Sequence, residues 1–216
     1  MQLDVGILVF PRVQQLDVTG PYEVFASVPG ATVHLLAKEA GTVTASSRMI
    51  LGPTIAMADC PRLDVFCVPG GDGVNALLQD AEVLAFVRAQ AARCRYITSV
   101  CTGALLLGAA GLLDGRRATT HWAAHDLLAA FGAIPVHERV VRDGNLITGG
   151  GVTAGIDFAL TVVTNLGPAE FIYGVGMLGS MPYTEFLVTG AQASVSSAQQ
   201  SSNGTSAMGM AVRPAY

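Results

Sequence analysis

The chain has 216 residues, of which 51% are hydrophobic and 13% are charged, and this composition suits one α/β domain with a large core. Its formal net charge of −4 and its lack of a basic cluster exclude the electrostatic footprint of a nucleic-acid-binding protein. The sequence contains no apolar run of membrane-spanning length, and its N-terminus carries an acid where a signal peptide has basic residues, so we expect a cytoplasmic protein.

The four cysteines, Cys60, Cys67, Cys94 and Cys101, show neither a C-x-x-C pair nor the spacing of a zinc finger. A disulfide framework or a structural zinc site therefore has no support in the sequence. We expect all of them to be reduced thiols.

The first expected element is a strand over residues 3–10, a nearly continuous apolar run typical of a parallel strand covered on both faces. The segment that follows places Asp17 in a loop, just before a helix that we expect to start near Gly20 with Pro21 in its first turn. Ligands of open α/β sheets bind beyond the carboxyl ends of the strands, so Asp17 is a candidate site residue. The alternative is a carboxylate that only caps the loop.

Two further strands are expected over residues 32–38 and 63–68, with short strands and loop between them. The second leads into the glycine-rich segment 69–73, which is followed by helices over residues 74–79 and 81–93. Consecutive glycines after a strand can present backbone N–H groups to an anion, although a tight turn alone also explains them. This segment is a second candidate at the same edge of the sheet.

Cys101 lies where a short, β-rich buried run over residues 96–100 gives way to an apolar helix over residues 104–113. A thiol at a helix N-terminus faces unpaired backbone N–H groups and the positive end of the helix dipole, so we expect a nucleophilic thiolate. Such a nucleophile elbow forces a sparsely populated backbone conformation at the cysteine. We expect the amides of Gly71 and Thr102 to form an oxyanion pocket facing the sulfur. The alternative is a buried core cysteine.

A helix is expected to open after Arg117, with Thr119 or Thr120 as its N-cap and His121 at its start. His121 and His125 have the i, i+4 spacing of metal ligands, but the segment has no HExxH glutamate and no third ligand nearby. A metal site is therefore not expected. His121 either lines the cysteine pocket as a hydrogen-bonding or acid–base group or only caps the helix.

The remaining expected elements are a hairpin with strands over residues 136–143 and 146–148 and an apolar helix over residues 156–165. The glycine run at residues 149–151 separates the hairpin from this helix. We expect this run to face the same edge of the sheet as Cys101.

The amino-acid composition changes at residue 168, after which glycine and serine interrupt the apolar residues. Residues 193–207 are low-complexity and polar, and such a segment cannot bury enough apolar area to offset its ordering entropy. We predict one α/β domain over residues 1–167 and a poorly ordered tail over residues 168–216.

Five ordered motifs together resemble the ThiJ/PfpI superfamily: DVTGP (17–21), PGG (69–71), SVCTG (99–103), ATTHW (118–122) and GGGVTAGID (149–157). Within it the chain is most similar to the isocyanide hydratases, in register from residue 3 to about 166. The resemblance implies a flavodoxin-like three-layer sandwich with a mostly parallel sheet, a nucleophile-elbow cysteine, a homodimer and no cofactor.

The resemblance also implies roles, with Cys101 as the nucleophile, Asp17 hydrogen-bonded to it and Thr102 beside them. Members of the superfamily with protease-type activity carry His directly after the cysteine, where this chain has Thr102, and deglycase-like members typically carry Glu where it has Asp17. Both positions fit a hydratase. The residues expected to line the oxyanion and substrate pocket are Gly71, Thr102, His121, Gly150 and Val152.

The activity that the resemblance implies is the addition of water to a small-molecule isocyanide, giving an N-substituted formamide through a thioimidate on Cys101. Asp17 is expected to supply the proton, because burial beside a thiolate raises the pKa of a carboxylic acid. The alternative is a non-enzymatic ligand- or redox-sensing domain, similar to those of AraC-type regulators. Such regulators append a basic helix-turn-helix module, which this sequence lacks. No nucleic-acid or membrane partner is expected.

Overall fold

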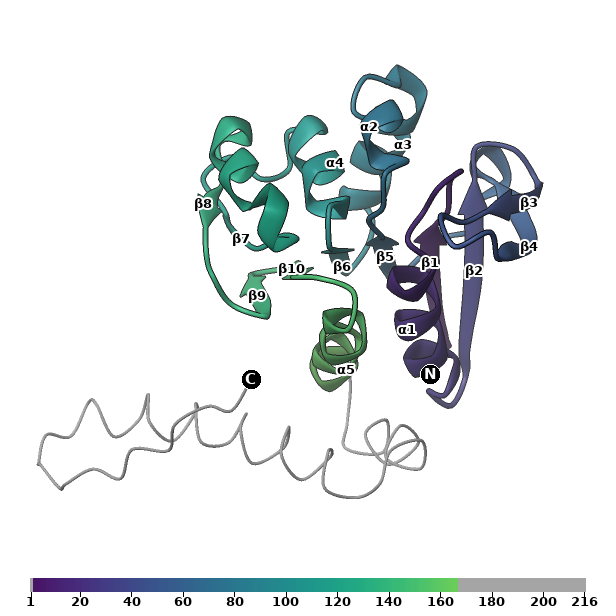
Figure 1. Cartoon of the computed structure of the whole chain (residues 1–216). Coiled ribbons are helices and arrows are strands. Elements are labelled where there is room, and N and C mark those ends of the chain that lie inside the picture. The colour runs from purple at the N-terminus through teal and green to yellow at the C-terminus, as the bar shows by residue number, and fades with distance from the viewer. Residues whose placement is uncertain (1, 167–216) are drawn as a thin grey trace, which may run out of the picture. The chain divides into compact units, whose positions relative to one another are not determined.

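The computed structural model describes residues 2–166, in which eight strands form one sheet and two short strands form a second. The strands of the large sheet are β1 (Leu3–Leu8), β2 (Ala31–Ala37), β3 (Gly41–Thr44), β4 (Ile50–Ala56), β5 (Val65–Val68), β6 (Tyr96–Val100), β9 (Val140–Asp143) and β10 (Leu146–Gly149). The short pair is β7 (Arg117–Ala118) and β8 (Ile134–Pro135). The helices are α1 (Gln15–Ala26), α2 (Val74–Leu77), α3 (Ala81–Ala91), α4 (Gly103–Ala109) and α5 (Ala154–Leu166), with 3-10 helices η1 (Met57–Asp59) and η2 (Trp122–Phe131) (Figure 1).

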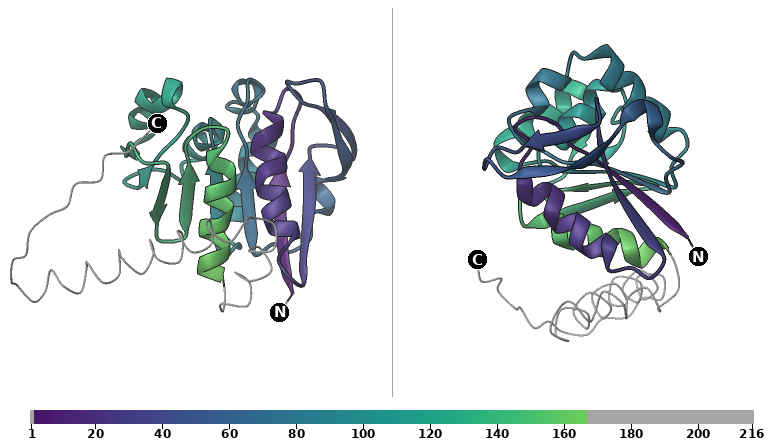
Figure 2. Two further views of the ribbon diagram at one scale, coloured as in Figure 1. Left: turned by 60° about the horizontal axis from the view of Figure 1, so that its bottom comes forward. Right: turned by 90° about the vertical axis from the view of Figure 1, so that its right-hand side faces the viewer.

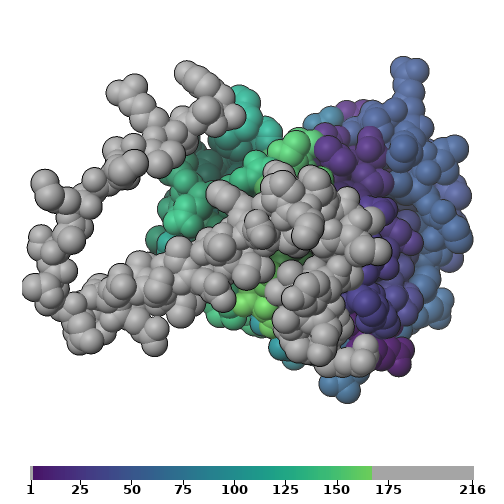
Figure 3. Space-filling model, turned by 90° about the horizontal axis from the view of Figure 1, so that it is seen from below, coloured from purple at the N-terminus to yellow at the C-terminus, as the bar shows by residue number. Residues whose placement is uncertain are grey.

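The large sheet has the order β3-β4-β2-β1-β5-β6-β10-β9. All neighbours from β4 to β10 run parallel, and only the edge strands β3 and β9 run antiparallel to their partners. Helices α1 and α5 lie side by side on one face, which Figure 3 views from outside. Helices α2, α3, α4 and η2 cover the other face (Figure 2). The predicted flavodoxin-like three-layer arrangement with a mostly parallel sheet is confirmed.

The central strands are apolar because helices cover both of their faces. Every residue of β5 and β6 is buried, and so are Val5 and Ile7 of β1. Burial on both faces explains why these strands have continuous apolar runs rather than an alternating pattern. It also brings the ends of β1, β5 and β6 together at one edge of the sheet.

Helix α1 begins at Gln15, so the prediction that it starts near Gly20 is wrong. Asp17 lies in the first turn of the helix, where the helix dipole favours an acid, so its predicted place in a loop is wrong as well. Pro21 lies inside the helix rather than in its first turn. Pro21 is tolerated there because it packs on α5, where a Cβ added to Gly155 would lie 3.2 Å from the Cδ of Pro21. Packing between the two helices therefore overrides the local preference of proline for a helix start.

The helix predicted after Arg117 is a 3-10 helix, η2, and its N-cap is His121 rather than Thr119 or Thr120. The Nδ1 atom of His121 accepts a hydrogen bond from the Ala123 amide at 3.3 Å. The backbone of Thr119 and the hydroxyl of Thr120 are used elsewhere: the Thr119 amide donates to the Thr148 hydroxyl at 2.9 Å, and the Thr120 hydroxyl donates to a backbone carbonyl.

Within residues 2–166, no helix combines the length and the apolar character needed to cross a bilayer. The predicted tail over residues 168–216, and with it the proposed end of the domain at residue 167, lie outside the described residues.

Candidate active site

Cys101 lies directly between β6 and α4 with a φ angle of 56°. This left-handed conformation is rare for a residue with a side chain and confirms the strained backbone expected of a nucleophile elbow. The Cys101 amide donates to the Gly149 carbonyl at 3.0 Å, which ties the turn to the end of β10. The residue is 5% exposed, so its thiol is nearly closed off from bulk water.

Thr120 holds the other side of the Cys101 peptide. Its hydroxyl donates to the Cys101 carbonyl oxygen at 2.7 Å, and Thr120 is itself buried. A short hydrogen bond inside the core stabilises the strained conformation, because neither partner can turn to water instead. The sequence analysis missed this role, since a threonine before a helix is also a common N-cap.

Asp17 reaches the same edge from the first turn of α1 and is fully buried. Its Oδ2 atom accepts a hydrogen bond from the Gly70 amide at 3.1 Å. Its Oδ1 atom has no hydrogen-bond partner of regular geometry among the described residues. The carboxyl group nevertheless lies close enough to the Cys101 thiol for each group to alter the pKa of the other. Oδ1 is therefore the Asp17 oxygen that no backbone donor among the described residues occupies.

The pKa values of both groups are raised, as predicted for Asp17 and contrary to the thiolate predicted for Cys101. Burial raises the pKa of Asp17 from 3.8 to about 6, while its contacts with Cys101 and the Gly70 amide lower it. Burial, followed by the charge of Asp17, raises the pKa of the Cys101 thiol from 9.0 to about 12. The raised pKa of the thiol favours the protonated form of Cys101, and because the two groups interact they titrate as a pair.

The prediction of a resting thiolate at Cys101 is thus wrong. Helix α4 has seven residues, and the donors at its start lower the pKa of the thiol less than burial and Asp17 raise it. The Thr102 amide and hydroxyl are the groups at the helix start that lower the pKa of the thiol. A carboxylate beside a thiol is instead suited to remove the proton at the moment when sulfur attacks.

Gly71 is placed at the site, but its amide does not face an oxyanion. It donates to the Thr102 hydroxyl at 3.0 Å, and that hydroxyl donates back to the Gly71 carbonyl at 3.4 Å. The predicted pairing of the Gly71 and Thr102 amides is therefore wrong, because the side chain of Thr102 occupies the Gly71 amide. The neighbouring Gly70 amide serves Asp17.

Gly70 has a second role that sequence reasoning missed. A Cβ at this position would lie 2.6 Å from the Thr102 nitrogen and 2.7 Å from the Cβ of Cys101. Only glycine lets the loop after β5 pass this close to Cys101. The glycine pair after the strand is the signal that could have identified it.

Three other predicted pocket residues lie on the segments next to Cys101. His121 packs its ring against Gly151, where an added Cβ would lie 3.0 Å from the Cδ2 of His121. The Gly150 amide donates to the Arg139 carbonyl at 2.9 Å, and Val152 has a φ angle of 21° in the turn before α5. All three residues are partly exposed, so they lie at the rim rather than in the buried core of the site.

His121 and His125 do not converge. His121 caps η2, whereas the His125 ring stacks on His137 with centroids 3.7 Å apart and contacts the Val136 carbonyl at 3.1 Å. Among residues 2–166 no group of three or more His, Cys, Asp or Glu side chains is arranged to hold a metal ion.

The model of the DJ-1/PfpI family matches residues 4–165 of the chain. The chain belongs to the DJ-1/PfpI family. A curated relative, the isonitrile hydratase of Pseudomonas putida, is 63% identical over 166 residues, which cover 77% of this chain and 73% of the hydratase. An HTH-type transcriptional regulator of Pseudomonas aeruginosa is 33% identical over 135 residues, covering 60% of this chain and 36% of the regulator.

A solved structure of a ThiJ/PfpI family protein from Pseudomonas syringae also resembles this member of the DJ-1/PfpI family. It superimposes with a TM-score of 0.79 at 46% sequence identity, and the match covers 82% of this chain and 74% of that one. The family assignment therefore has support from both the sequence and the fold.

Proposed function

We propose that this DJ-1/PfpI family member is an isocyanide hydratase, which adds water to an isocyanide and releases an N-substituted formamide. The observation that carries the proposal is a buried Cys101–Asp17 pair in a chain that is 63% identical to a curated isonitrile hydratase. That enzyme acts on isonitriles by its name, and the pair supplies a nucleophile and a proton carrier of suitable chemistry.

In the first step the Asp17 carboxylate takes the thiol proton while the sulfur of Cys101 attacks the terminal carbon of the isocyanide. Asp17 then gives that proton to the same carbon. The product is a thioimidate, in which the carbon is bonded to sulfur and hydrogen and doubly bonded to nitrogen. A carboxyl group with a pKa of about 6 suits both transfers, because it accepts and releases a proton readily near neutral pH.

In the second step Asp17 takes a proton from water as the oxygen adds to the thioimidate carbon, and passes it to the nitrogen. The resulting tetrahedral carbon carries hydroxyl, amine and sulfur. Loss of the hydroxyl proton through Asp17 forms the formamide carbonyl and breaks the carbon–sulfur bond, which returns the proton to Cys101. The Thr102 amide and hydroxyl stabilise negative charge on the departing sulfur, since both lower the pKa of the Cys101 thiol.

Turnover of p-nitrophenyl isocyanide, followed by formation of the formamide, tests this proposal. Replacing Cys101 by Ala should abolish turnover while the protein stays folded. Replacing Cys94, a buried thiol outside the site, by Ala is the matched control and should leave turnover near the parent rate. Near-normal formamide production by C101A would refute the mechanism.

The sensing alternative rests on similarity to the transcriptional regulator from Pseudomonas aeruginosa. A redox sensor needs a thiolate that peroxide can oxidise, whereas burial and Asp17 raise the pKa of Cys101 to about 12. Mass spectrometry after mild peroxide treatment separates the two functions, because oxidation of Cys101 without isocyanide turnover would favour the sensor.

We further propose that the protein acts as a homodimer in the cytoplasm. The exposed apolar side chains of Trp122 and Leu127 on η2 and Ile134 on the adjoining β8 support self-association. The four cysteines are all free, which supports a reducing compartment. Sedimentation that gives a single species at the monomer mass of 22.3 kDa would refute the dimer.

A further inference from the structure

The turn between β10 and α5, over residues 150–153, contains a strained residue. Val152 has a φ angle of 21°, a value that a β-branched side chain strongly disfavours. Such a conformation persists only where the surrounding structure holds it. Contacts between this turn and its neighbours must therefore fix the backbone of Val152.

Arg139, which directly precedes the edge strand β9, contacts the turn on both sides of Val152. Before Val152, the Arg139 carbonyl accepts a hydrogen bond from the Gly150 amide at 2.9 Å. After Val152, the Arg139 guanidinium donates to the Thr153 hydroxyl at 3.1 Å and forms an ion pair with Asp157. One residue thus holds both ends of the strained segment.

The ion pair depends on the fork shape of arginine. Asp157 lies in the first turn of α5, and its side chain is only 17% exposed. A carboxylate with so little access to water needs a charged partner, and Arg139 supplies it. A guanidinium presents several N–H groups in a fixed plane, so it bonds Asp157 and Thr153 at once, whereas lysine offers a point charge.

The turn is joined to the candidate active site by two contacts. The Gly149 carbonyl, directly before the turn, accepts the hydrogen bond of the Cys101 amide at 3.0 Å. The His121 ring packs against Gly151 inside the turn. Val152 and His121 are both partly exposed at the rim of the site, so a shift of the turn would change the shape of that rim.

We propose that Arg139 is a positioning residue, which holds the turn over residues 150–153 in the shape that admits the substituent of an isocyanide. Its hydrogen bonds go to the turn and to α5, so it acts through Val152 and His121 rather than on the reacting atoms. The inference rests on the proposed hydratase function for its substrate. The hold of Arg139 on the turn can be measured without one.

The test is Arg139→Gln, which keeps a polar side chain at an exposed position and should fold. We expect KM for p-nitrophenyl isocyanide to rise about fivefold while kcat stays within about twofold, because binding of the substituent is weakened and the chemistry is not. For methyl isocyanide, whose substituent is a single carbon, KM should change less. Arg139→Lys should recover part of the lost KM, since it restores the charge beside Asp157 but not the fork.

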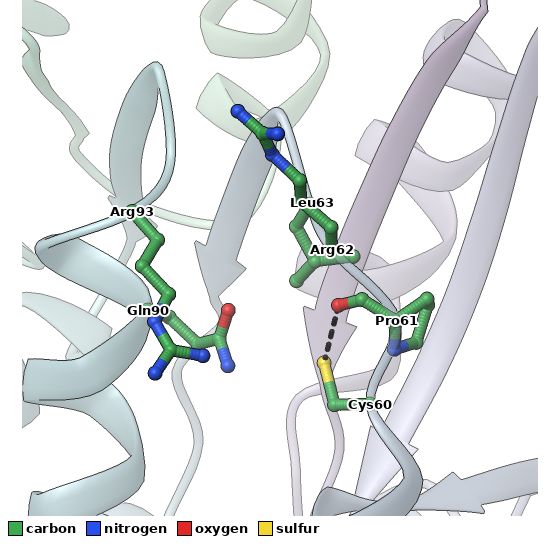
Figure 4. Close-up of a pocket in the computed structure, with 6 residues that line it drawn as sticks. All are labelled: Cys60, Pro61, Arg62, Leu63, Gln90 and Arg93. Atoms are coloured by element: carbon green, nitrogen blue, oxygen red, sulfur yellow. Dashed lines mark hydrogen bonds between the residues drawn. The ribbon is translucent and has the colours of Figure 1, made fainter.

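Two other arginines provide controls. Arg117 is 54% exposed against 55% for Arg139, and it pairs with Glu138 at 3.7 Å rather than with the turn, so Arg117→Gln is the matched variant. Arg93 lies at the opposite end of the strands, beside a cavity of about 360 Å³ between α3 and the segment that leads into β5 (Figure 4). Arg117→Gln and Arg93→Gln should both keep the KM of the parent.

Amide hydrogen exchange followed by NMR reads the turn without a substrate. The Gly150 and Ala154 amides are hydrogen-bonded at the two ends of the turn, so their protection should fall about fivefold in Arg139→Gln and in neither control. A parent that hydrates no isocyanide would refute the proposed function, while the exchange rates would still decide whether Arg139 holds the turn. Unchanged protection in Arg139→Gln, or an equal rise of KM for both isocyanides, would overturn the inference.

Discussion

Replacement of Asp17 by Asn tests the buried acid most directly, because Asn keeps the shape of the side chain but cannot ionise. Asp17 is fully buried, and its pKa rises from 3.8 to about 6. A group whose pKa is raised by folding stabilises the folded state when protonated, and loses that contribution as the pH rises through its folded pKa. Ionisation of Asp17 therefore costs the folded protein about 3 kcal/mol at pH 8 and about 0.5 kcal/mol at pH 4.

Urea unfolding of the parent and of D17N at these two pH values measures this cost. We expect the free energy of unfolding of D17N to exceed that of the parent by up to about 3 kcal/mol at pH 8. This difference should shrink as the pH falls toward 4. Asp59 is exposed, so Asp59→Asn is the control for loss of a negative charge. The difference in unfolding free energy between this control and the parent should not depend on pH in this way. A D17N protein that is less stable than the parent by about 1 kcal/mol at both pH values would mean that Asp17 only caps the chain, and would refute the reasoning.

D17N should also turn over isocyanide more slowly than the parent. Loss of the proton carrier predicts a rate of isocyanide turnover lower by about 10²–10⁴-fold, while Cys101 remains open to alkylation. In the parent, kcat/KM should fall as the pH drops below about 6, because protonated Asp17 cannot accept the thiol proton. A rate within a few-fold of the parent would leave Asp17 without a catalytic role and make His121 the next candidate for the acid.

Further predictions concern the groups around the sulfur. Thr102→Val leaves the Gly71 amide without its acceptor and the sulfur without a donor, so turnover should fall about tenfold and alkylation of Cys101 should require a higher pH. Thr120→Val leaves the buried Cys101 carbonyl unpaired, and should cost about 1–3 kcal/mol in urea unfolding and lower kcat, whereas Thr120→Ser should restore both. Gly70→Ala drives a Cβ against Thr102 and Cys101, so turnover should be lost even where circular dichroism shows a folded protein. Parent-like turnover in any of these proteins would contradict the geometry described.

The position of Cys101 was predictable because it depends on local sequence. A buried β-rich run followed at once by an Ala/Leu-rich helix places the residue between them at a sharp turn, and the φ angle of 56° at Cys101 agrees. The parallel sheet was predictable for a similar reason, since strands covered on both faces need continuous apolar runs. Asp17 could be assigned to the same edge from sheet topology alone.

The protonation state and the hydrogen-bond partners of the site depended on tertiary structure. The pKa values of Asp17 and Cys101 follow from burial by segments far apart in the chain, and burial outweighs the helix-start effect that the local sequence predicts. The Gly71 amide and the Thr120 hydroxyl each find a partner across the fold rather than in the roles expected from their neighbours. The sequence by itself therefore determined that Cys101 lies at a sharp turn between a strand and a helix, because the signals for that strand and that helix are local. Packing decided which group holds its proton, because desolvation and hydrogen-bond distances exist only once distant segments meet.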